Sequence, residues 1–300
     1  MPKWFFYALL ALVFWGGWGF ASKRIGDAVS ATECQVISTL GLLPIVAVLA
    51  WRAGAAIRGR STRAVVIAFV SGLASGLGNI PFYWLLGGGE KAATVVPLTS
   101  LYPLVTVVLA VPLLRERLNG VQKLGIALAL VAIYIFNAGQ TSGLFSTWLA
   151  YALLPIFLWG LAGLLQKMCT NDLSAAVSTF WFLGGLAAVS VGLLVWKPMR
   201  WDFPTSTWTW GVTLGLLLGL GNLALLAAFA SQGKASVITP LSGLYPLVTV
   251  PLAVCFLGER VSPREWAAIA LSVVAVVALC SERSNQKTAG ADSPEASEIG

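Results

Sequence analysis

The sequence of 300 residues is 58% hydrophobic and 10% charged, with a mean hydropathy of +0.84. Because a soluble domain carries about a quarter charged residues, this composition excludes a soluble globular protein and predicts a chain that lies mostly in lipid. The formal net charge of +7 fits basic residues at the ends of membrane-spanning helices, so it predicts no nucleic-acid partner.

Apolar runs recur along the chain at about the length that a helix needs to cross roughly 30 Å of hydrocarbon. They are continuous rather than alternating, which excludes a spanning β-barrel. The predicted fold class is therefore an all-α membrane protein with ten transmembrane helices. In chain order these lie at residues 4–21, 33–51, 64–86, 92–114, 120–137, 145–165, 175–196, 209–230, 235–257 and 265–280. The polar tail, residues 281–300, lacks apolar residues that could pack, so we expect it to be disordered.

An internal repeat fills almost the whole chain. Residues 91–128 and 234–271 match at a constant offset of 143, with about half of the positions identical, and Trp15-Gly16 recurs as Trp159-Gly160 at an offset of 144. Self-similarity on this scale indicates a duplicated structural unit.

Each copy of the repeat holds five predicted helices, residues 1–138 forming the first unit and residues 144–280 the second. An odd number of helices forces the second copy to enter the membrane in the opposite orientation. Two inverted copies can exchange conformations around a substrate site at their interface. The repeat therefore predicts alternating access, with a cavity lined by the first, third, fourth, sixth, eighth and ninth helices.

The distribution of basic residues predicts the orientation in the membrane. If the N-terminus is cytoplasmic, twelve of the 19 Lys and Arg residues lie on the cytoplasmic side, as the positive-inside rule requires. The excess comes mainly from the loop between Arg52 and Arg63. Both termini are then expected to be cytoplasmic.

Tryptophan and glutamine side chains mark the first and sixth helices as candidates for substrate binding. Trp15 and Trp18 share a face of the first, and Trp159 shares a face with Gln166 in the sixth. Tryptophan usually anchors a helix at the membrane interface, but Trp15 and Trp159 fall deep within their helices. We therefore expect a stacking surface for an apolar or aromatic ligand.

A polar stripe runs down the third helix. Ser75, Asn79 and Tyr83 follow one another at intervals of four residues and are candidate substrate-binding residues. Asn222 in the eighth helix repeats Asn79 and is a further candidate. The structural alternative is that the two asparagines only hold helices together.

Paired prolines interrupt the fourth and ninth helices. Pro97 and Pro103 recur as Pro240 and Pro246. A proline lacks its own N–H donor and tends to free the carbonyl four residues earlier. In lipid such a break is tolerated where it faces a cavity or a neighbouring helix, so the four prolines are candidate hinges or gates.

Polar side chains next to these prolines are candidate substrate-binding residues. They are Thr99, Ser100, Tyr102, Ser242 and Tyr245. A tyrosine in the middle of a membrane helix is costly unless its hydroxyl is paired, which implies a pocket or an interhelical bond. The structural alternative is a packing kink whose free carbonyls are satisfied by the Thr and Ser hydroxyls.

Several chemistries are not supported by the sequence. Every Asp and Glu falls at a helix end or in a loop, so no membrane-embedded carboxylate is available for proton coupling. The chain has no histidine, and its four cysteines are far apart, which argues against a metal or redox cofactor. Without a buried acid, a histidine or a metal, we do not expect an enzyme or any cofactor.

Three short sequence features of the first half recur at equivalent positions in the second half. They are Trp15-Gly16, Pro97 and Glu116-Arg117, and their copies Trp159-Gly160, Pro240 and Glu259-Arg260. With these motifs, about 280 residues of the chain resemble the drug/metabolite transporter superfamily, specifically its ten-span members built from two EamA-type repeats. Among these, the chain most resembles the bacterial aromatic amino-acid exporters.

The resemblance implies an inner-membrane exporter of amino acids, aromatic and other neutral ones, working as a uniporter or with a coupling that the sequence leaves open. Sugars, nucleotide derivatives or other small metabolites and drugs are the alternative substrates. The expected partners are the small-molecule substrate and the lipid bilayer. Because both repeats lie in one chain, a monomer can enclose the site, and we expect no obligatory protein partner.

Overall fold

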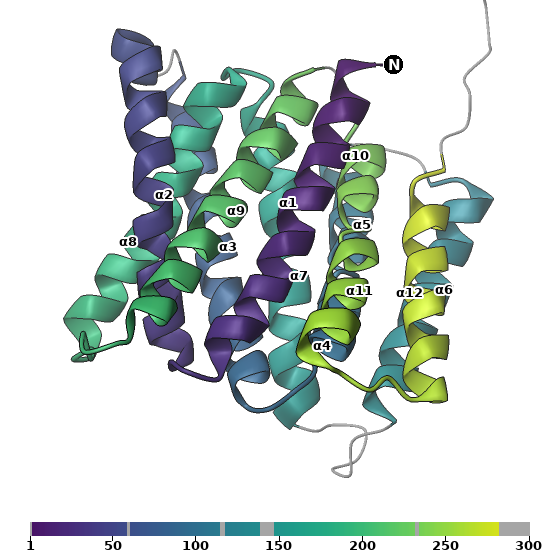
Figure 1. Cartoon of the computed structure of the whole chain (residues 1–300). Coiled ribbons are helices and arrows are strands. Elements are labelled where there is room, and N and C mark those ends of the chain that lie inside the picture. The colour runs from purple at the N-terminus through teal and green to yellow at the C-terminus, as the bar shows by residue number, and fades with distance from the viewer. Residues whose placement is uncertain (1, 59–60, 115–117, 139–146, 232–233, 282–300) are drawn as a thin grey trace, which may run out of the picture.

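The computed structural model describes residues 2–58, 61–114, 118–138, 147–231 and 234–281 (Figure 1). Most of these residues are helical and none of them forms a strand, which confirms the predicted all-α class. The tail that we expected to be disordered lies outside the described residues from residue 282 onward. The helices are α1 (Lys3–Gly26), α2 (Ala31–Ala53), α3 (Thr62–Gly87), α4 (Ala92–Thr99), α5 (Pro103–Leu114), α6 (Gly120–Asn137), α7 (Thr147–Cys169), α8 (Ala175–Trp196), α9 (Thr205–Ala230), α10 (Ala235–Ser242), α11 (Pro246–Leu257) and α12 (Pro263–Leu279), with a short 3-10 helix η1 (Gly54–Arg58) after α2.

The twelve α-helices make up ten membrane spans, because α4 and α5 form one broken span and α10 and α11 form another. Within the described residues, nine stretches are long and apolar enough to cross a membrane, and α12, with 17 residues, completes the set. This confirms the predicted number of spans. Helix α1 begins and α12 ends on one side of the bundle, which we call the Lys3 face; the opposite side is the Lys91 face (Figure 1).

The breaks in the fourth and ninth spans follow from the second proline of each pair. Pro103 begins α5 and Pro246 begins α11, since a helix does not need an N–H donor at its first position. The first proline of each pair, Pro97 or Pro240, lies inside the preceding short helix. Each span is therefore two short helices with a turn between them rather than one kinked helix.

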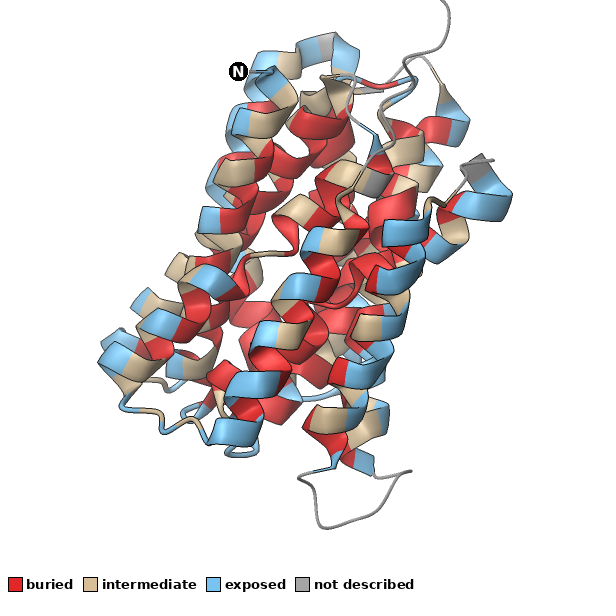
Figure 2. Cartoon of the chain, turned by 90° about the vertical axis from the view of Figure 1, so that its right-hand side faces the viewer, coloured by how far each residue is buried: buried red, intermediate tan, exposed pale blue. Residues whose placement is uncertain are grey.

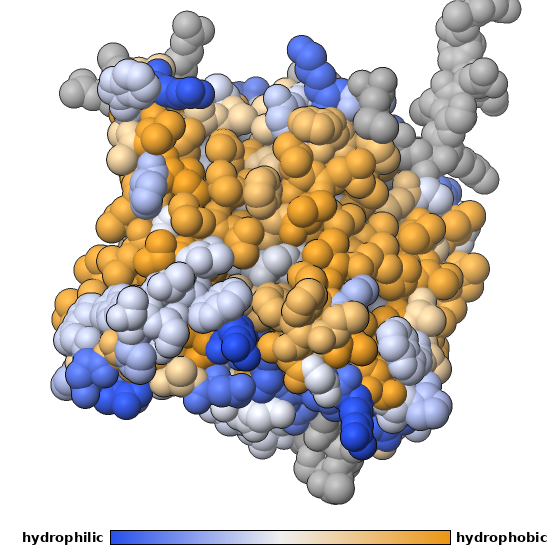
Figure 3. All heavy atoms as spheres, viewed as in Figure 1, coloured by the Kyte–Doolittle hydropathy of each residue, from blue (hydrophilic) through white to orange (hydrophobic). Residues whose placement is uncertain are grey.

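The outer surface is suited to lipid. Apolar side chains cover the middle of the surface in Figure 3, and hydrophilic ones gather toward its upper and lower edges. Buried residues face the inside of the bundle, while the outward sides of the helices are exposed (Figure 2). The large exposed side chains, such as Leu43, Val70 and Val274, are the ones that would contact acyl chains.

The two repeats are interleaved rather than side by side. The most extensive packing joins α1 to α9 and α3 to α7, and each pair takes one helix from each repeat. Equivalent hydrogen bonds occur in both copies. Thr106 donates to the carbonyl of Gly160 at 2.7 Å, and its counterpart Thr249 donates to the carbonyl of Gly16 at 2.8 Å. The fold is thus pseudo-symmetric down to single side chains.

Glycines allow two of the crossings between repeats to be very close. At Gly215 of α9 an added Cβ would lie 1.8 Å from the carbonyl oxygen of Ser38 in α2. At Gly185 of α8 it would lie 2.1 Å from the carbonyl oxygen of Phe69 in α3. Only glycine fits at such a crossing, because the atom met is backbone rather than a movable side chain.

Candidate functional site

A cavity lies between the two repeats, where the broken spans meet the long helices. The empty space among its lining atoms amounts to about 460 Å³. Helices α1 and α3 and the turn before α5 supply the wall from the first repeat, and α7, α9 and the turn before α11 supply it from the second. The lining residues are Trp15, Trp18, Ser75, Asn79, Tyr102, Trp159, Ala162, Gln166, Leu218, Asn222, Leu225 and Tyr245, none of them charged.

Five aromatic rings form much of the wall and contact one another edge to face. The ring of Trp15 lies 6.3 Å from that of Tyr102 and 6.2 Å from that of Tyr245, between centroids. Trp159 lies 6.4 Å from Tyr102 and 5.6 Å from Trp18. These T-shaped contacts hold the rings in place and leave an apolar surface against which a ligand can pack.

Asn79 is the centre of a polar network that crosses four helices. Its side-chain oxygen accepts from Trp159 Nε1 at 3.2 Å, and its Nδ2 donates to Gln35 Oε1 at 3.2 Å. Gln35 in turn donates to Ser190 Oγ of α8 at 3.3 Å. Sequence reasoning missed Gln35 and Ser190; the signal that could have found them is that both are polar residues within apolar helices.

The second repeat arranges the same elements differently. Gln166 Nε2 donates to Asn222 Oδ1 at 3.1 Å, and Asn222 Nδ2 donates to the carbonyl of Leu218 at 2.9 Å. Trp15 occupies the place equivalent to Trp159 but has no hydrogen-bond partner for its Nε1. Both asparagines thus bond to other helices, as the structural alternative expected, and both also line the cavity.

Four of the candidate substrate-binding residues are not on the wall. Tyr83 is buried and accepts from Trp18 Nε1 at 3.2 Å. Thr99 and Ser100 donate to carbonyls of their own helix, at 2.8 Å to Val95 and 2.8 Å to Pro97. Ser242 donates to the carbonyl of Thr239 at 2.9 Å and lies 3.3 Å from the hydroxyl of Tyr102. Tyr83 and Ser242 therefore contact the wall residues Trp18 and Tyr102 from outside the cavity.

The other nine candidates are brought together at the cavity, and their role in binding stays a prediction. They are Trp15, Trp18, Ser75, Asn79, Tyr102, Trp159, Gln166, Asn222 and Tyr245. Sequence reasoning missed Ala162, Leu218 and Leu225, which are apolar residues in apolar helices and carry no signal of their own. Leu218 is the repeat counterpart of Ser75, so equivalent places on the wall differ in polarity.

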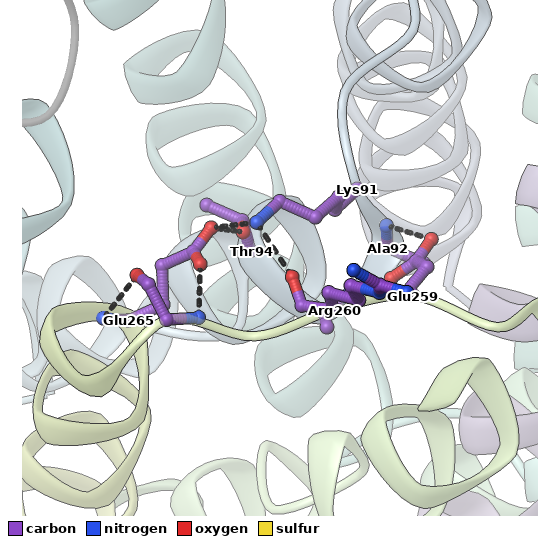
Figure 4. A network of polar contacts seen from close by, with 8 residues as sticks. Lys91, Ala92, Thr94, Glu259, Arg260 and Glu265 are labelled. Atoms are coloured by element: carbon purple, nitrogen blue, oxygen red, sulfur yellow. Dashed lines mark hydrogen bonds and ion pairs between the residues drawn. The ribbon is translucent and has the colours of Figure 1, made fainter. Parts of the chain in front are cut away.

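At the Lys91 face, Glu259 from the second repeat caps a helix of the first (Figure 4). Its carboxylate accepts from the backbone N–H groups of Ala92 and Ala93, both at 2.8 Å. Lys91, the N-cap residue of α4, provides no side-chain cap of its own. A carboxylate at a helix N-terminus is stabilised by the N–H groups and by the helix dipole. The contact therefore ties the two repeats together at the start of the broken span, on the Lys91 face.

Lys91 strengthens the same connection. Its ammonium forms an ion pair with Glu265 of α12 and donates to the carbonyl of Arg260 at 3.0 Å, while Thr94 Oγ1 donates to Glu265 at 2.8 Å. Next to it, burial raises the pKa of the Glu90 carboxyl. The repeat counterpart of Glu265 is the uncharged Gln122. The counterpart of the Glu259-Arg260 pair, residues 116–117, lies outside the described residues.

Comparison with known proteins agrees with this architecture. A model of the EamA-like transporter family matches residues 2–138 and 146–281. An uncharacterized transporter from Archaeoglobus fulgidus is 26% identical over 277 residues, which cover 91% of this chain and 96% of that protein. An uncharacterized protein from Methanocaldococcus jannaschii is 28% identical over 129 residues, which cover 43% of this chain and 92% of that protein, so it is about as long as one repeat. One solved crystal structure shares the fold, with a TM-score of 0.69 at 18% identity over 92% of this chain and 95% of that one.

Proposed function

Because the chain belongs to the EamA-like transporter family and is a multi-pass membrane transporter of small molecules, we propose that its substrates are amino acids, aromatic and other neutral ones. We propose that it exports them across the bacterial inner membrane by alternating access, with both termini cytoplasmic and a monomer as the working unit. The observation that carries the proposal is the cavity between the repeats, which is rich in aromatic rings and free of charged side chains.

The cavity wall favours a zwitterion over a charged ligand. A ligand with net charge would lose its hydration among Trp15, Trp18 and Trp159 without an opposite charge on the wall, which is costly. An amino acid with a neutral side chain carries both charges itself. Its side chain can then pack against the aromatic rings, as an aromatic or large apolar group does best.

A sugar fits the wall less well. Its hydroxyls would each need a hydrogen-bond partner, and the polar side chains of the wall are few. Asn79, Gln166 and Asn222 are already bonded to protein groups. Because a buried polar group without a partner is costly, the wall selects against a ligand with many hydroxyls.

Flux measurements test the proposal directly. The purified chain is reconstituted in liposomes loaded with radiolabelled phenylalanine, and efflux is followed without an imposed pH gradient. We expect saturable flux that is accelerated by unlabelled neutral amino acids on the opposite side and is unaffected by glucose. Liposomes containing heat-inactivated protein serve as the control. If no amino acid moves under any imposed gradient, the amino-acid proposal is wrong.

The prolines inside the short helices are predicted to ease the exchange between open states. Replacing Pro97 or Pro240 by alanine restores a backbone N–H inside α4 or α10 and favours a straighter, stiffer span. We expect the maximal rate of flux to fall about threefold to tenfold with little change in KM, since opening steps often limit turnover. The matched control is Pro44→Ala, a proline inside α2 on the lipid-facing surface. If the maximal rate of flux is the same in Pro97→Ala, Pro240→Ala and Pro44→Ala, then Pro97 and Pro240 do not act as hinges.

A further inference from the structure

The two repeats place different side chains at equivalent positions of the cavity wall. Trp18 of α1 and Ala162 of α7 are repeat counterparts, at the offset of 144, and both line the cavity. Ser75 of α3 and Leu218 of α9 are counterparts at the offset of 143, and both line it as well. At these positions the first repeat is therefore bulky and polar, whereas the second is small and apolar.

The bulk of Trp18 is fixed by neighbours that the second repeat lacks. Its ring stacks on that of Phe82, with 4.7 Å between centroids, and its Nε1 donates to Tyr83 Oη at 3.2 Å. The counterparts of Phe82 and Tyr83 are Leu225 and Leu226. Where the first repeat holds an indole ring against two aromatic residues, the second has the methyl group of an alanine near two leucines.

The smaller residue lets the cavity reach further into the second repeat. Phe82 lies behind Trp18, is fully buried and does not line the cavity, whereas its counterpart Leu225 does. Ala162 therefore leaves uncovered the position that Trp18 covers in the first repeat. Leu218 lies on the same face of α9, two turns before Leu225. We call the part of the cavity bounded by Ala162, Leu218 and Leu225 the apolar compartment.

The first repeat offers a hydrogen-bonding group in place of this apolar surface. Ser75 is 9% exposed, more than Asn79, Gln166 or Asn222 on the same wall. A serine hydroxyl both donates and accepts, so it can bind either charged group of an amino acid. Its counterpart Leu218 can do neither. The two sides of the cavity thus suit the two different ends of an amino acid.

We propose that Ala162 determines which substrate side chains the cavity accepts. The apolar compartment takes the side chain of the amino acid, and the charged groups face Ser75. This inference rests on the proposed amino-acid function and names the part of the wall that distinguishes one amino acid from another. Burial of apolar surface favours a ligand in proportion to the area buried, so a large neutral side chain binds best. A bulky residue in place of Ala162, as at Trp18, would fill the compartment and leave room for small side chains only.

Adding bulk to the compartment tests its role. The fluxes of phenylalanine and alanine are measured in the same liposomes, each amino acid with its own radiolabel, so that the ratio of the two rates gives the preference. In Ala162→Leu the new side chain occupies part of the compartment. We expect the preference for phenylalanine over alanine to fall at least about tenfold, since one methylene group in an apolar pocket changes discrimination about 10- to 200-fold.

Removing bulk should have the opposite effect. Leu218→Ala enlarges the compartment, and we expect the preference for tryptophan over phenylalanine to rise at least about threefold, because the indole ring needs more room than the phenyl ring. A purely structural role of Leu218 would lower both rates together and leave their ratio unchanged.

Two further variants serve as matched comparisons. Ala150→Leu makes the same change on an exposed side of the same helix, so the preference should equal that of the parent. Ser75→Leu introduces the residue of its counterpart Leu218 and should slow phenylalanine and alanine alike, because both carry the same charged groups. An unchanged preference in Ala162→Leu, or an equal fall in Ser75→Leu, overturns the proposal. If Ala162→Leu does not fold, as judged by its elution from a sizing column, Leu218→Ala carries the test, and an unchanged preference for tryptophan overturns the proposal.

The two proposals can fail separately. A wild-type protein that transports no amino acid overturns the proposed function. A wild-type protein that transports phenylalanine, together with an unchanged preference in Ala162→Leu, overturns only the assignment of the side chain to the apolar compartment.

Discussion

Replacing Gly185 by alanine is expected to destabilise the protein severely, whereas the same change at the adjacent Gly184 is expected to be tolerated. A Cβ at Gly185 would lie 2.1 Å from the carbonyl oxygen of Phe69 and 2.8 Å from the backbone nitrogen of Leu73. Both atoms belong to the backbone of α3, so the whole helix would have to move. A Cβ at Gly184 meets only the ring of Phe69, at 3.9 Å, which is an ordinary contact.

The expected difference between the two variants is large. Forcing extra volume into a packed interior costs about 1–3 kcal/mol, and more where backbone must shift. Alanine otherwise favours a helix over glycine by up to about 1 kcal/mol, so Gly184→Ala should be neutral or slightly stabilising. Thermal unfolding in detergent, followed by tryptophan fluorescence, measures the difference. Equal unfolding temperatures would show that α3 and α8 do not cross as closely as described.

Removing Glu259 is expected to open the cavity to the Lys91 face. In Glu259→Ala the N–H groups of Ala92 and Ala93 lose their shared acceptor, and the contact between the repeats at this face weakens. Hydrogen bonds to a charged group contribute about 1.5–3 kcal/mol each, less where water reaches them, as it does at the half-buried Glu259. The population open to this face should therefore rise about tenfold.

Cysteine labelling measures this shift. A cysteine replaces Ala162 on the cavity wall, in a protein whose Cys255 and Cys280 are changed to alanine, and a membrane-impermeant maleimide is added to the Lys91 face. The matched control is Asp172→Ala, which removes one negative charge from an exposed turn at the Lys3 face. A labelling rate that is the same in Glu259→Ala, the control and the parent would show that the Glu259 contact does not hold this face closed.

The membrane spans of this fold could be predicted from the sequence, but the packing partners of each span could not. Continuous apolar runs and the repeat were sufficient for the ten spans, because hydrocarbon thickness sets their length. Which spans pack together could not be predicted, since lipid and helix surfaces are equally apolar and neither is preferred. Gly184 and Gly185 are adjacent glycines that the sequence does not distinguish, yet only Gly185 lies at the close crossing with α3.

Residues of the cavity wall could be predicted from the sequence where their side chains are costly to place in lipid. Asn79, Trp159 and Tyr102 could be selected because a polar group in mid-membrane needs a partner or a cavity. The same reasoning was misleading for Ser100, whose hydroxyl bonds to a carbonyl one turn earlier in its own span and so needs no cavity. Leu225 lines the wall without any distinguishing chemistry, so no sequence argument could have found it.

If the protein works by the proposed alternating access, its interleaved packing means that the moving parts differ from the duplicated units. Helices α1 and α2 of the first repeat pack on α9 of the second, and α7 and α8 of the second pack on α3 of the first. Alternating access would therefore rock two mixed bundles, each built from both repeats, and neither repeat alone contains a complete moving body. If the chain were cut between residues 138 and 147, the two fragments together could still form both mixed bundles. Either fragment made by itself would lack the helices of the other repeat against which it packs most extensively.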